Sequence, residues 1–167
     1  MKHIPLTQGM VAIVDDDDYE SLNQWKWFAC ATGSGKYYYA IRQQTVGKKK
    51  QRGIMMHRQI MKATNAELVD HRSRDTLDNR KSNLRKCDRV GNGANAAMRT
   101  DNASGFKGVY FNKRASKWIA QIGDRSLPGA HIGRFDSALS AAIAYDAAAI
   151  ARFGEFACTN KSLGLYA

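Results

Sequence analysis

The sequence predicts an α+β protein assembled from small modules, and three observations support this prediction. Short runs rich in aromatic and β-branched residues fill the first third of the chain and predict strands. A polar and basic segment, residues 69–95, gathers carboxylates, amides, a histidine and many arginines, a mixture typical of a functional site. Residues 137–152 then repeat apolar residues at helical spacing, so a single long helix follows a last group of strands.

Residues 1–56 are expected to form a small β-rich module. Four consecutive aspartates at 15–18 follow a strand region and precede a short helix at 19–24. Because adjacent residues do not converge on one ion and anions stabilise a helix N-terminus, a solvated helix start is favoured over a metal site. Three more strands complete the module, at 25–29, 37–42 and 52–56, with turns at 33–35 and 47–50 between them.

Residues 57–100 are expected to form the second domain. A helix at 57–62 leads into two short strands, 67–69 and 83–87, separated by a polar loop at 72–80. A further helix is expected from Arg89 to about Arg99 with Asp88 as its N-cap. Asp70 and His71 leave the end of the first strand, and Asn92 lies on the first helical turn.

The spacing of these residues resembles the HNH nuclease motif, the ββα-metal finger, in its phage homing-endonuclease form. Asp70 and His71 match the first motif position, Asn83 the central one and Asn92 the third. Asn83 follows His71 by 12 residues, and Asn92 follows Asn83 by 9. Asn79 is a rival for the central position, with Asn83 favoured. His57 begins a phrase that also precedes the motif in phage relatives, and we expect it to pack or position rather than catalyse.

The resemblance implies metal-assisted hydrolysis of a phosphodiester. His71 would take a proton from water, and Asn83 would fix the loop or orient His71. Asp70 and Asn92 offer hard oxygen ligands, which suit Mg²⁺ or Mn²⁺ better than Zn²⁺. Cations around the motif would hold DNA phosphates: Arg72, Arg80 and Arg85.

A short polar linker, residues 101–104, separates this domain from a third module at 105–167. Three antiparallel strands are expected there, at 106–111, 117–122 and 130–135, with a turn at 128–129 before the last one. A helix at 137–152, N-capped by Asp136, would pack on the sheet. Its apolar stripe is expected to be Leu139, Ile143, Ala147 and Ile150.

The phrases at 108–109, 117–120, 132–135 and 144–146 resemble the Apetala-two/ethylene-response-factor DNA-binding domain. In that family the sheet enters the major groove. Carried over by position, the DNA contacts fall on Lys107, Tyr110, Asn112, Arg114, Lys117, Gln121 and Arg134. The family has arginines where Tyr110, Asn112 and Gly123 stand, so DNA binding carries over but guanine readout at those positions does not.

Composition favours a nucleic-acid partner. The net charge is +11, and all three predicted parts are basic, which indicates a polyanion contacted along the whole chain. The three cysteines form no paired motif, so neither a zinc ribbon nor a disulfide framework is expected. The sequence predicts no membrane segment or signal peptide, and therefore an intracellular, cytoplasmic protein of a phage or prokaryote.

The leading interpretation is a metal-dependent DNA endonuclease that nicks double-stranded DNA, with the C-terminal module supplying site specificity. The alternative is a sequence-specific DNA-binding regulator whose nuclease finger is inactive. An RNA-binding protein is a weaker third interpretation, supported only by charge and aromatic content. The sequence indicates no obligatory protein partner.

Overall fold

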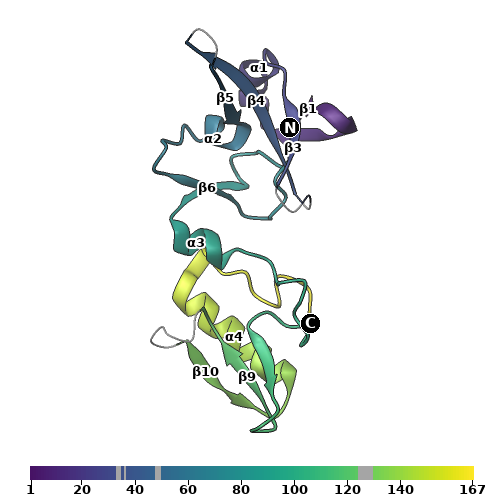
Figure 1. Ribbon diagram of the computed structural model, residues 1–167, viewed down its shortest axis with the longest axis vertical. Helices are drawn as coiled ribbons and strands as arrows, with labels where there is room; N and C mark the ends of the chain where they lie inside the picture. The colour runs from purple at the N-terminus through teal and green to yellow at the C-terminus, as the bar shows by residue number, and fades with distance from the viewer. Residues whose placement is uncertain (33–34, 36, 48–49, 124–129) are drawn as a thin grey trace. The chain divides into compact units, whose positions relative to one another are not determined.

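The structure is a computed structural model that describes residues 1–32, 35, 37–47, 50–123 and 130–167. The predicted mixture of helices and several small sheets is confirmed (Figure 1). The chain forms two compact units, Met1–Arg89 and Val90–Ala167, where the sequence suggested three domains. The predicted turns at 33–35, 47–50 and 128–129 lie wholly or partly outside the described residues.

The first unit contains three small antiparallel sheets and two helices. Strand β1 pairs with β2, β4 lies between β3 and β5, and β6 pairs with β7. Its elements are β1 (Lys2–Pro5), η1 (Thr7–Gly9), β2 (Val11–Val14), α1 (Asp16–Asn23), β3 (Phe28–Ala31), β4 (Tyr38–Val46), β5 (Lys50–Met55), α2 (Met56–Ile60), β6 (Leu68–His71) and β7 (Leu84–Cys87).

One hydrophobic core explains why the two predicted N-terminal domains form a single unit. Ile4 and Val14 of the first sheet, Trp27, and Met56 of α2 are each at most 2% exposed. They pack in the same cluster as Leu84 of β7. The strands that carry the candidate motif are therefore held by side chains from residues 1–56.

The aspartate run begins helix α1, as the sequence indicated, but the helix starts at Asp16 rather than at residue 19. Two of the aspartates also fix the far side of the motif loop. Asp15 accepts a hydrogen bond from the backbone N–H of Lys81 at 2.8 Å, and Asp18 pairs with the Lys81 ammonium at 2.8 Å. The run thus ties the segment before β7 to the start of α1.

The second unit pairs one three-stranded sheet with one long helix. Strand β9 lies between β8 and β10, and a bulge interrupts β10 between His131 and Gly133. The elements are α3 (Arg89–Ala94), β8 (Val109–Asn112), β9 (Lys117–Gln121), β10 (His131–Phe135), α4 (Ala138–Phe153) and η2 (Gly154–Phe156). Arg89, the first residue of α3, is the last residue of the first unit.

Helix α3 is shorter than predicted, ending at Ala94 instead of about Arg99. Its Gly91 is buried, and a Cβ there would come within 3.0 Å of the Phe156 ring. The glycine that weakens the helix therefore allows Phe156 to approach it. No helix in the described part of the chain is long and apolar enough to cross a membrane.

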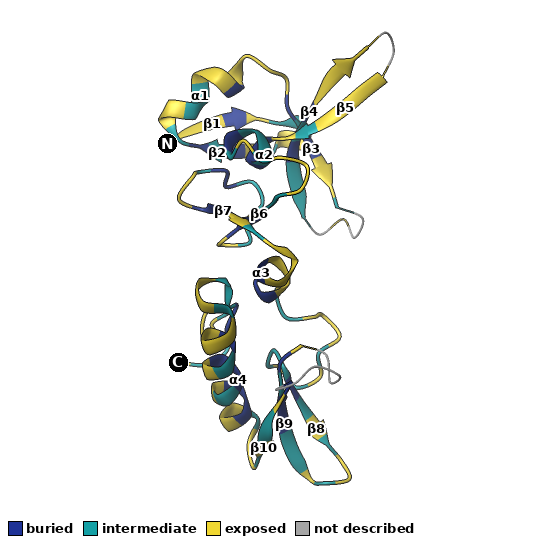
Figure 2. Cartoon of the chain, turned by 90° about the vertical axis from the view of Figure 1, so that its left-hand side faces the viewer, coloured by how far each residue is buried: buried dark blue, intermediate teal, exposed yellow. Residues whose placement is uncertain are grey.

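The predicted apolar stripe of α4 is wrong. Leu139, Ile143 and Ile150 are 45%, 50% and 58% exposed, and the exposed face is visible in Figure 2. The helix instead buries a face on which three of the five residues are alanines, which let the sheet approach closely. The buried residues are Ala141, Ala142, Tyr145, Asp146 and Ala149. The N-cap is Ser137, whose Oγ accepts from the N–H of Ser140 at 3.0 Å, not Asp136.

Buried Asp146 gives this helix face a polar anchor. Its carboxylate accepts hydrogen bonds from the Asn160 N–H at 2.7 Å, from the Lys161 N–H at 2.9 Å and from the Tyr166 hydroxyl at 2.6 Å. The Asn160 side chain in turn accepts a hydrogen bond from the N–H of Lys107 and donates one to the carbonyl of Lys107. Asp146 therefore fixes the C-terminal segment against the start of the β8 strand.

Candidate functional site

The β6–β7 hairpin positions the predicted catalytic pair. In its register Asp70 lies opposite Arg85 and His71 opposite Leu84. Asp70 is 9% and His71 4% exposed, so both side chains are buried although they end a strand. The hairpin is short, and its stability comes from the core beneath Leu84 rather than from strand pairing alone.

Asp70 forms a buried ion pair with Arg85. The Nε and Nη2 atoms of Arg85 donate to one carboxylate oxygen, Oδ2, at 2.9 and 2.8 Å. The two side chains are only 10% and 5% exposed, so each charge depends on the other for its solvation. Arg85, which the sequence suggested as a DNA contact, is thus placed as the partner of the predicted metal ligand.

The environment of His71 keeps its imidazole neutral. Burial lowers the pKa of His71, and a hydrogen bond with Asn79 and the nearby carboxylates of Asp70, Asp75 and Asp78 oppose this effect. Because burial is the largest influence, the neutral form dominates at neutral pH. A neutral imidazole is the form that can accept a proton from water.

His71 belongs to a cluster of three aromatic rings. Its ring centroid lies 5.0 Å from that of His57 in an edge-to-face arrangement and 6.0 Å from that of Tyr39. Burial, reinforced by the positive charge of a protonated His71, lowers the pKa of His57 to about 3. His57 therefore packs as a neutral ring, in the role expected for it from the sequence, whereas Tyr39 was not singled out.

Asn83 holds the loop between the two strands. Its Oδ1 accepts from the Ser73 N–H at 2.9 Å, and its Nδ2 donates to the Asp78 carbonyl at 2.8 Å. Its backbone carbonyl accepts from the Arg72 N–H at 2.8 Å. These contacts match the loop-fixing role considered for Asn83, while the rival Asn79 lies beside His71.

The same loop is fixed to the first sheet. Ile13 and Asp78 form an isolated parallel bridge, in which the Ile13 N–H donates to Leu77 and the Asn79 N–H donates to Ile13. The Thr76 hydroxyl donates to the Tyr38 carbonyl at 2.6 Å. These contacts fix the loop between β6 and β7 against the rest of the first unit, so the residues that surround His71 are held in one conformation.

The other predicted residues of this region are placed differently. Arg72 is exposed on the loop, whereas Arg80 makes a double hydrogen bond to Asp78, at 2.8 and 2.6 Å. Asn92 is exposed on α3 and belongs to the second compact unit, so its part in a metal site stays a prediction.

The residues that the structure describes offer few protein ligands for a metal ion at this site. In the described part of the chain, no three His, Cys, Asp or Glu side chains come close enough to hold one metal together. Mg²⁺, however, usually keeps several waters and is held by one or two carboxylates together with substrate phosphate. Asp70 would offer such an ion a carboxylate oxygen.

The sheet of the second unit collects most of the predicted DNA contacts on one face. Val109, Trp118 and Ala120 pack toward α4. Since neighbouring residues of a strand point to opposite faces, the residues between them point away from the helix. Tyr110 lies opposite Ile119, which lies opposite Arg134, and Asn112 lies opposite Lys117. This face, which we call the outer sheet face, carries Tyr110, Asn112, Lys117, Ile119, Gln121 and Arg134.

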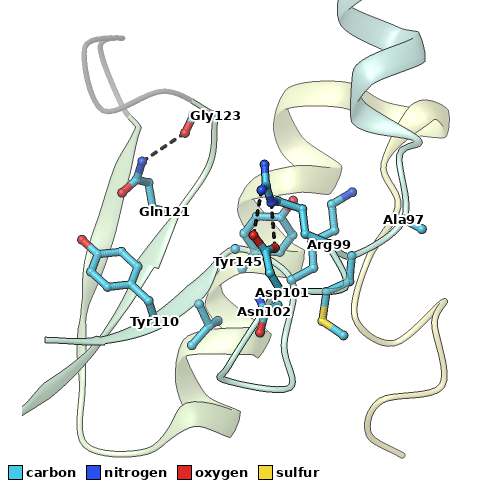
Figure 3. A pocket seen from close by; sticks show the side chains of 12 residues that line it. Ala97, Arg99, Asp101, Asn102, Tyr110, Gln121, Gly123 and Tyr145 are labelled. Carbon is cyan, nitrogen blue, oxygen red and sulfur yellow. Dashed lines mark hydrogen bonds and ion pairs between the residues drawn. The ribbon is translucent and has the colours of Figure 1, made fainter. Parts of the chain in front are cut away.

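A pocket of about 490 Å³ opens where the outer sheet face meets the loop before β8. Tyr110 and Gln121 line it from the sheet, and Gln121 donates to the Gly123 carbonyl at 3.0 Å (Figure 3). On the loop side Arg99 and Asp101 form a double hydrogen bond at 2.9 and 2.7 Å. The pocket thus places aromatic and amide side chains beside an exposed guanidinium.

The remaining predicted contacts are partly engaged within the unit. The Lys107 ammonium donates to the carbonyls of Ala94 and Ala96, at 2.9 and 2.6 Å, and so caps the end of α3. Lys117 pairs with exposed Asp136. Arg114 and Arg134 line a second pocket, of about 360 Å³, together with Asn112. The two arginines are exposed.

We compared the chain with known protein families, curated proteins and solved structures. No protein-family model, no curated protein and no solved structure matches the chain.

Proposed function

We propose that the protein is a metal-dependent DNA endonuclease that hydrolyses phosphodiester bonds, with His71 as the general base. The single observation that supports this best is the environment of His71. Its imidazole is buried beside a carboxylate, is kept neutral by burial and is surrounded by a loop fixed through Asn83.

A divalent ion would supply the charge that neutralises the scissile phosphate and the leaving oxygen. Asp70 is the residue of the first unit that would hold it, and Asn92 remains the predicted second ligand. His71 accepts the proton of the attacking water, while the ring of His57 limits how the imidazole can turn. Exposed Arg72 lies next to His71 in sequence, where it can contact a phosphate.

The outer sheet face would supply the grip on duplex DNA. It combines the cations Lys117 and Arg134 with Asn112, Gln121 and Tyr110, groups that can contact both backbone and base edges. Contacts around one phosphate carry little sequence information, so a nuclease with a target site needs a second reader of this kind.

The test is nicking of supercoiled plasmid. Wild-type protein is expected to convert it to open circles with Mg²⁺ or Mn²⁺ and to stop in EDTA. His71→Ala should reduce the rate by roughly 10²–10⁴-fold, the usual contribution of a general base. His3→Ala, the same change at an exposed histidine of β1, is the matched control. Undiminished nicking by purified His71→Ala protein would refute the proposal.

One observation favours a second candidate, a DNA-binding regulator without nuclease activity. Oδ2 of Asp70 already accepts two hydrogen bonds from Arg85, which neutralises the carboxylate that a metal would use. If this pair persists on DNA, the protein would bind duplex without cutting it. Metal-independent duplex binding, with no nicking in either Mg²⁺ or Mn²⁺, would identify that case.

A further inference from the structure

The first unit contains a pocket lined by basic residues, where β4, β5 and α2 meet. Its volume is about 430 Å³, and none of the residues placed in the β6–β7 site lines it. Four cations line the pocket: Arg42, Arg52, Arg58 and Lys62. Its lining, taken from the described residues, includes no carboxylate. Four positive charges around one hollow are unfavourable unless an anion enters it.

The three arginines are held in place by neutral oxygens, so their charges are not cancelled. Arg58 donates to the carbonyls of Glu67 and Thr64, at 2.8 and 2.6 Å. Arg52 donates to the side-chain oxygen of Asn65 at 2.8 Å. These bonds use some N–H groups of each guanidinium and fix its position before any ligand arrives, which lowers the entropy cost of binding.

Arg42 provides an independent sign of a ligand. The residue is only 7% exposed, and its Nε donates to Gln59 at 2.9 Å. Its Nη1 is buried and has no hydrogen-bond partner among the residues that the structure describes. Its guanidinium carbon lies 4.3 Å from the centre of the Trp25 ring, so a cation–π contact helps to hold the group in place. Buried donors without partners are rare in folded proteins, and a bound anion is one reason for them.

We propose that this pocket, which shares no lining residue with the β6–β7 site, binds a phosphate of the DNA backbone. The proposal rests on the proposed function in that it takes duplex DNA as the ligand. Arginine guanidinium groups match the geometry of phosphate oxygens. Arg52 and Lys62 are exposed at the rim, and the outer part of the β4–β5 hairpin beside them is exposed as well (Figure 2). A long polyanion can therefore reach the pocket from solvent.

The first experiment measures duplex binding without divalent ions, so it does not depend on cleavage. The pocket variant is Arg52→Gln/Lys62→Gln, which spares the more buried Arg42 and Arg58. The control Lys2→Gln/Lys26→Gln removes the same charge from exposed positions outside the pocket. If the variant binds one DNA phosphate fewer than the wild type, the slope of log K against log salt should become shallower by about 0.9. The control should keep the wild-type slope.

The second experiment locates the contact on the DNA. Ethylation of individual phosphates should reveal one position that weakens binding of wild-type and control protein but not of the pocket variant. Identical interference patterns for all three proteins would overturn the proposal. In a separate NMR titration, inorganic phosphate should shift the backbone amides of Gly53 and Ala63, which line the pocket. Shifts there combined with unchanged DNA interference would mean that the pocket takes free phosphate, which also overturns the assignment to DNA.

These outcomes are separate from the test of the endonuclease. A protein that binds duplex through the pocket and never nicks it contradicts only the proposed function. A protein that nicks plasmid normally, with the pocket variant indistinguishable from the control in both slope and interference, contradicts only the phosphate pocket.

Discussion

At the scale of single residues, burial sets the protonation of the two facing histidines. The pKa of His57 is lowered to about 3, against about 6.5 in an unfolded chain. Between these values the unfolded state binds a proton that the folded state does not. The contribution of neutral His57 to the free energy of unfolding is therefore fully present above pH 6.5 and decreases as the pH falls toward 3. His71, whose pKa is also lowered, adds to this loss.

The prediction is a slope of roughly 1.4 kcal/mol per pH unit from His57 within this window. Urea unfolding at intervals between pH 7 and pH 4 would measure it. His57→Gln should have a visibly flatter pH dependence than wild type, and His3→Gln, at an exposed position of β1, is the matched control. Equal slopes for wild type and His57→Gln would show that His57 titrates normally in the folded state.

A second prediction concerns the buried pair of Asp70 and Arg85. Arg85→Met leaves a carboxylate that is 10% exposed without its cation, and the free energy of unfolding at pH 7 should fall by about 3–5 kcal/mol. Adding Asp70→Asn to this variant should recover part of the loss, because the unpaired charge is gone. A double-mutant cycle from urea unfolding measures the coupling. Strict additivity of the two losses would mean that the pair contributes nothing as a pair.

At the scale of elements, the start of β8 depends on one glycine. Gly108 has φ +73°, and a Cβ there would meet the Tyr145 ring at 2.1 Å and the Gln121 carbonyl oxygen at 2.8 Å. Gly105 has nearly the same φ, +76°, but nothing within 4 Å of its Cβ position. Alanine substitutions at these two glycines therefore distinguish the effect of backbone strain, which both share, from the effect of steric overlap, which only Gly108 has.

Both alanine variants should be destabilised by about 1 kcal/mol or slightly more by the positive φ. Gly108→Ala should cost roughly another 1–3 kcal/mol, because the ring of Tyr145 and the sheet must move apart. Thermal unfolding of the two variants beside wild type gives the comparison. Equal melting temperatures for Gly105→Ala and Gly108→Ala would show that the close contact between β8 and α4 is not tightly packed.

Helix and strand positions were largely predictable because each element has a local signal. Strand β9 is predicted from a short apolar run with aromatic and β-branched residues, and α4 from its alanine-rich run, each within one residue or so of the observed ends. The face of α4 was not predictable from large apolar residues, since the sheet selects alanines that permit close approach. The close approach of Phe156 to Gly91 in α3 joins residues that lie far apart in sequence, so no local pattern predicts it.

At the scale of the whole molecule, the sequence suggested candidate site residues but not the contacts that surround them. Asp70, His71 and Asn83 were proposed from their spacing and from a motif that this spacing resembles, and their functional roles stay predictions. The ion pair of Asp70 with Arg85 depends on strand register, and the ring of Tyr39 beside His71 depends on how a separate sheet packs. The single core shared by residues 1–56 and β7 likewise arises from contacts that no local pattern encodes.

The positive charge of the chain leads to the last prediction. Both units carry an excess of cations, and the total net charge is +11, so DNA should be held by each unit separately. Arg114→Gln/Arg134→Gln removes two exposed cations beside the outer sheet face. For every phosphate that this variant no longer binds, the salt dependence of duplex binding should become shallower by about 0.9.

The matched control for this variant is Lys113→Gln/Lys161→Gln, which removes two exposed cations of the same unit that do not line that pocket. Combined with Arg52→Gln/Lys62→Gln of the first unit, the sheet variant should show the sum of the two slope changes, because different units would bind different phosphates. Binding titrations at four or more salt concentrations measure all the slopes. If the sheet variant behaves like its control, Arg114 and Arg134 do not bind DNA phosphates, and this part of the proposed interface is wrong.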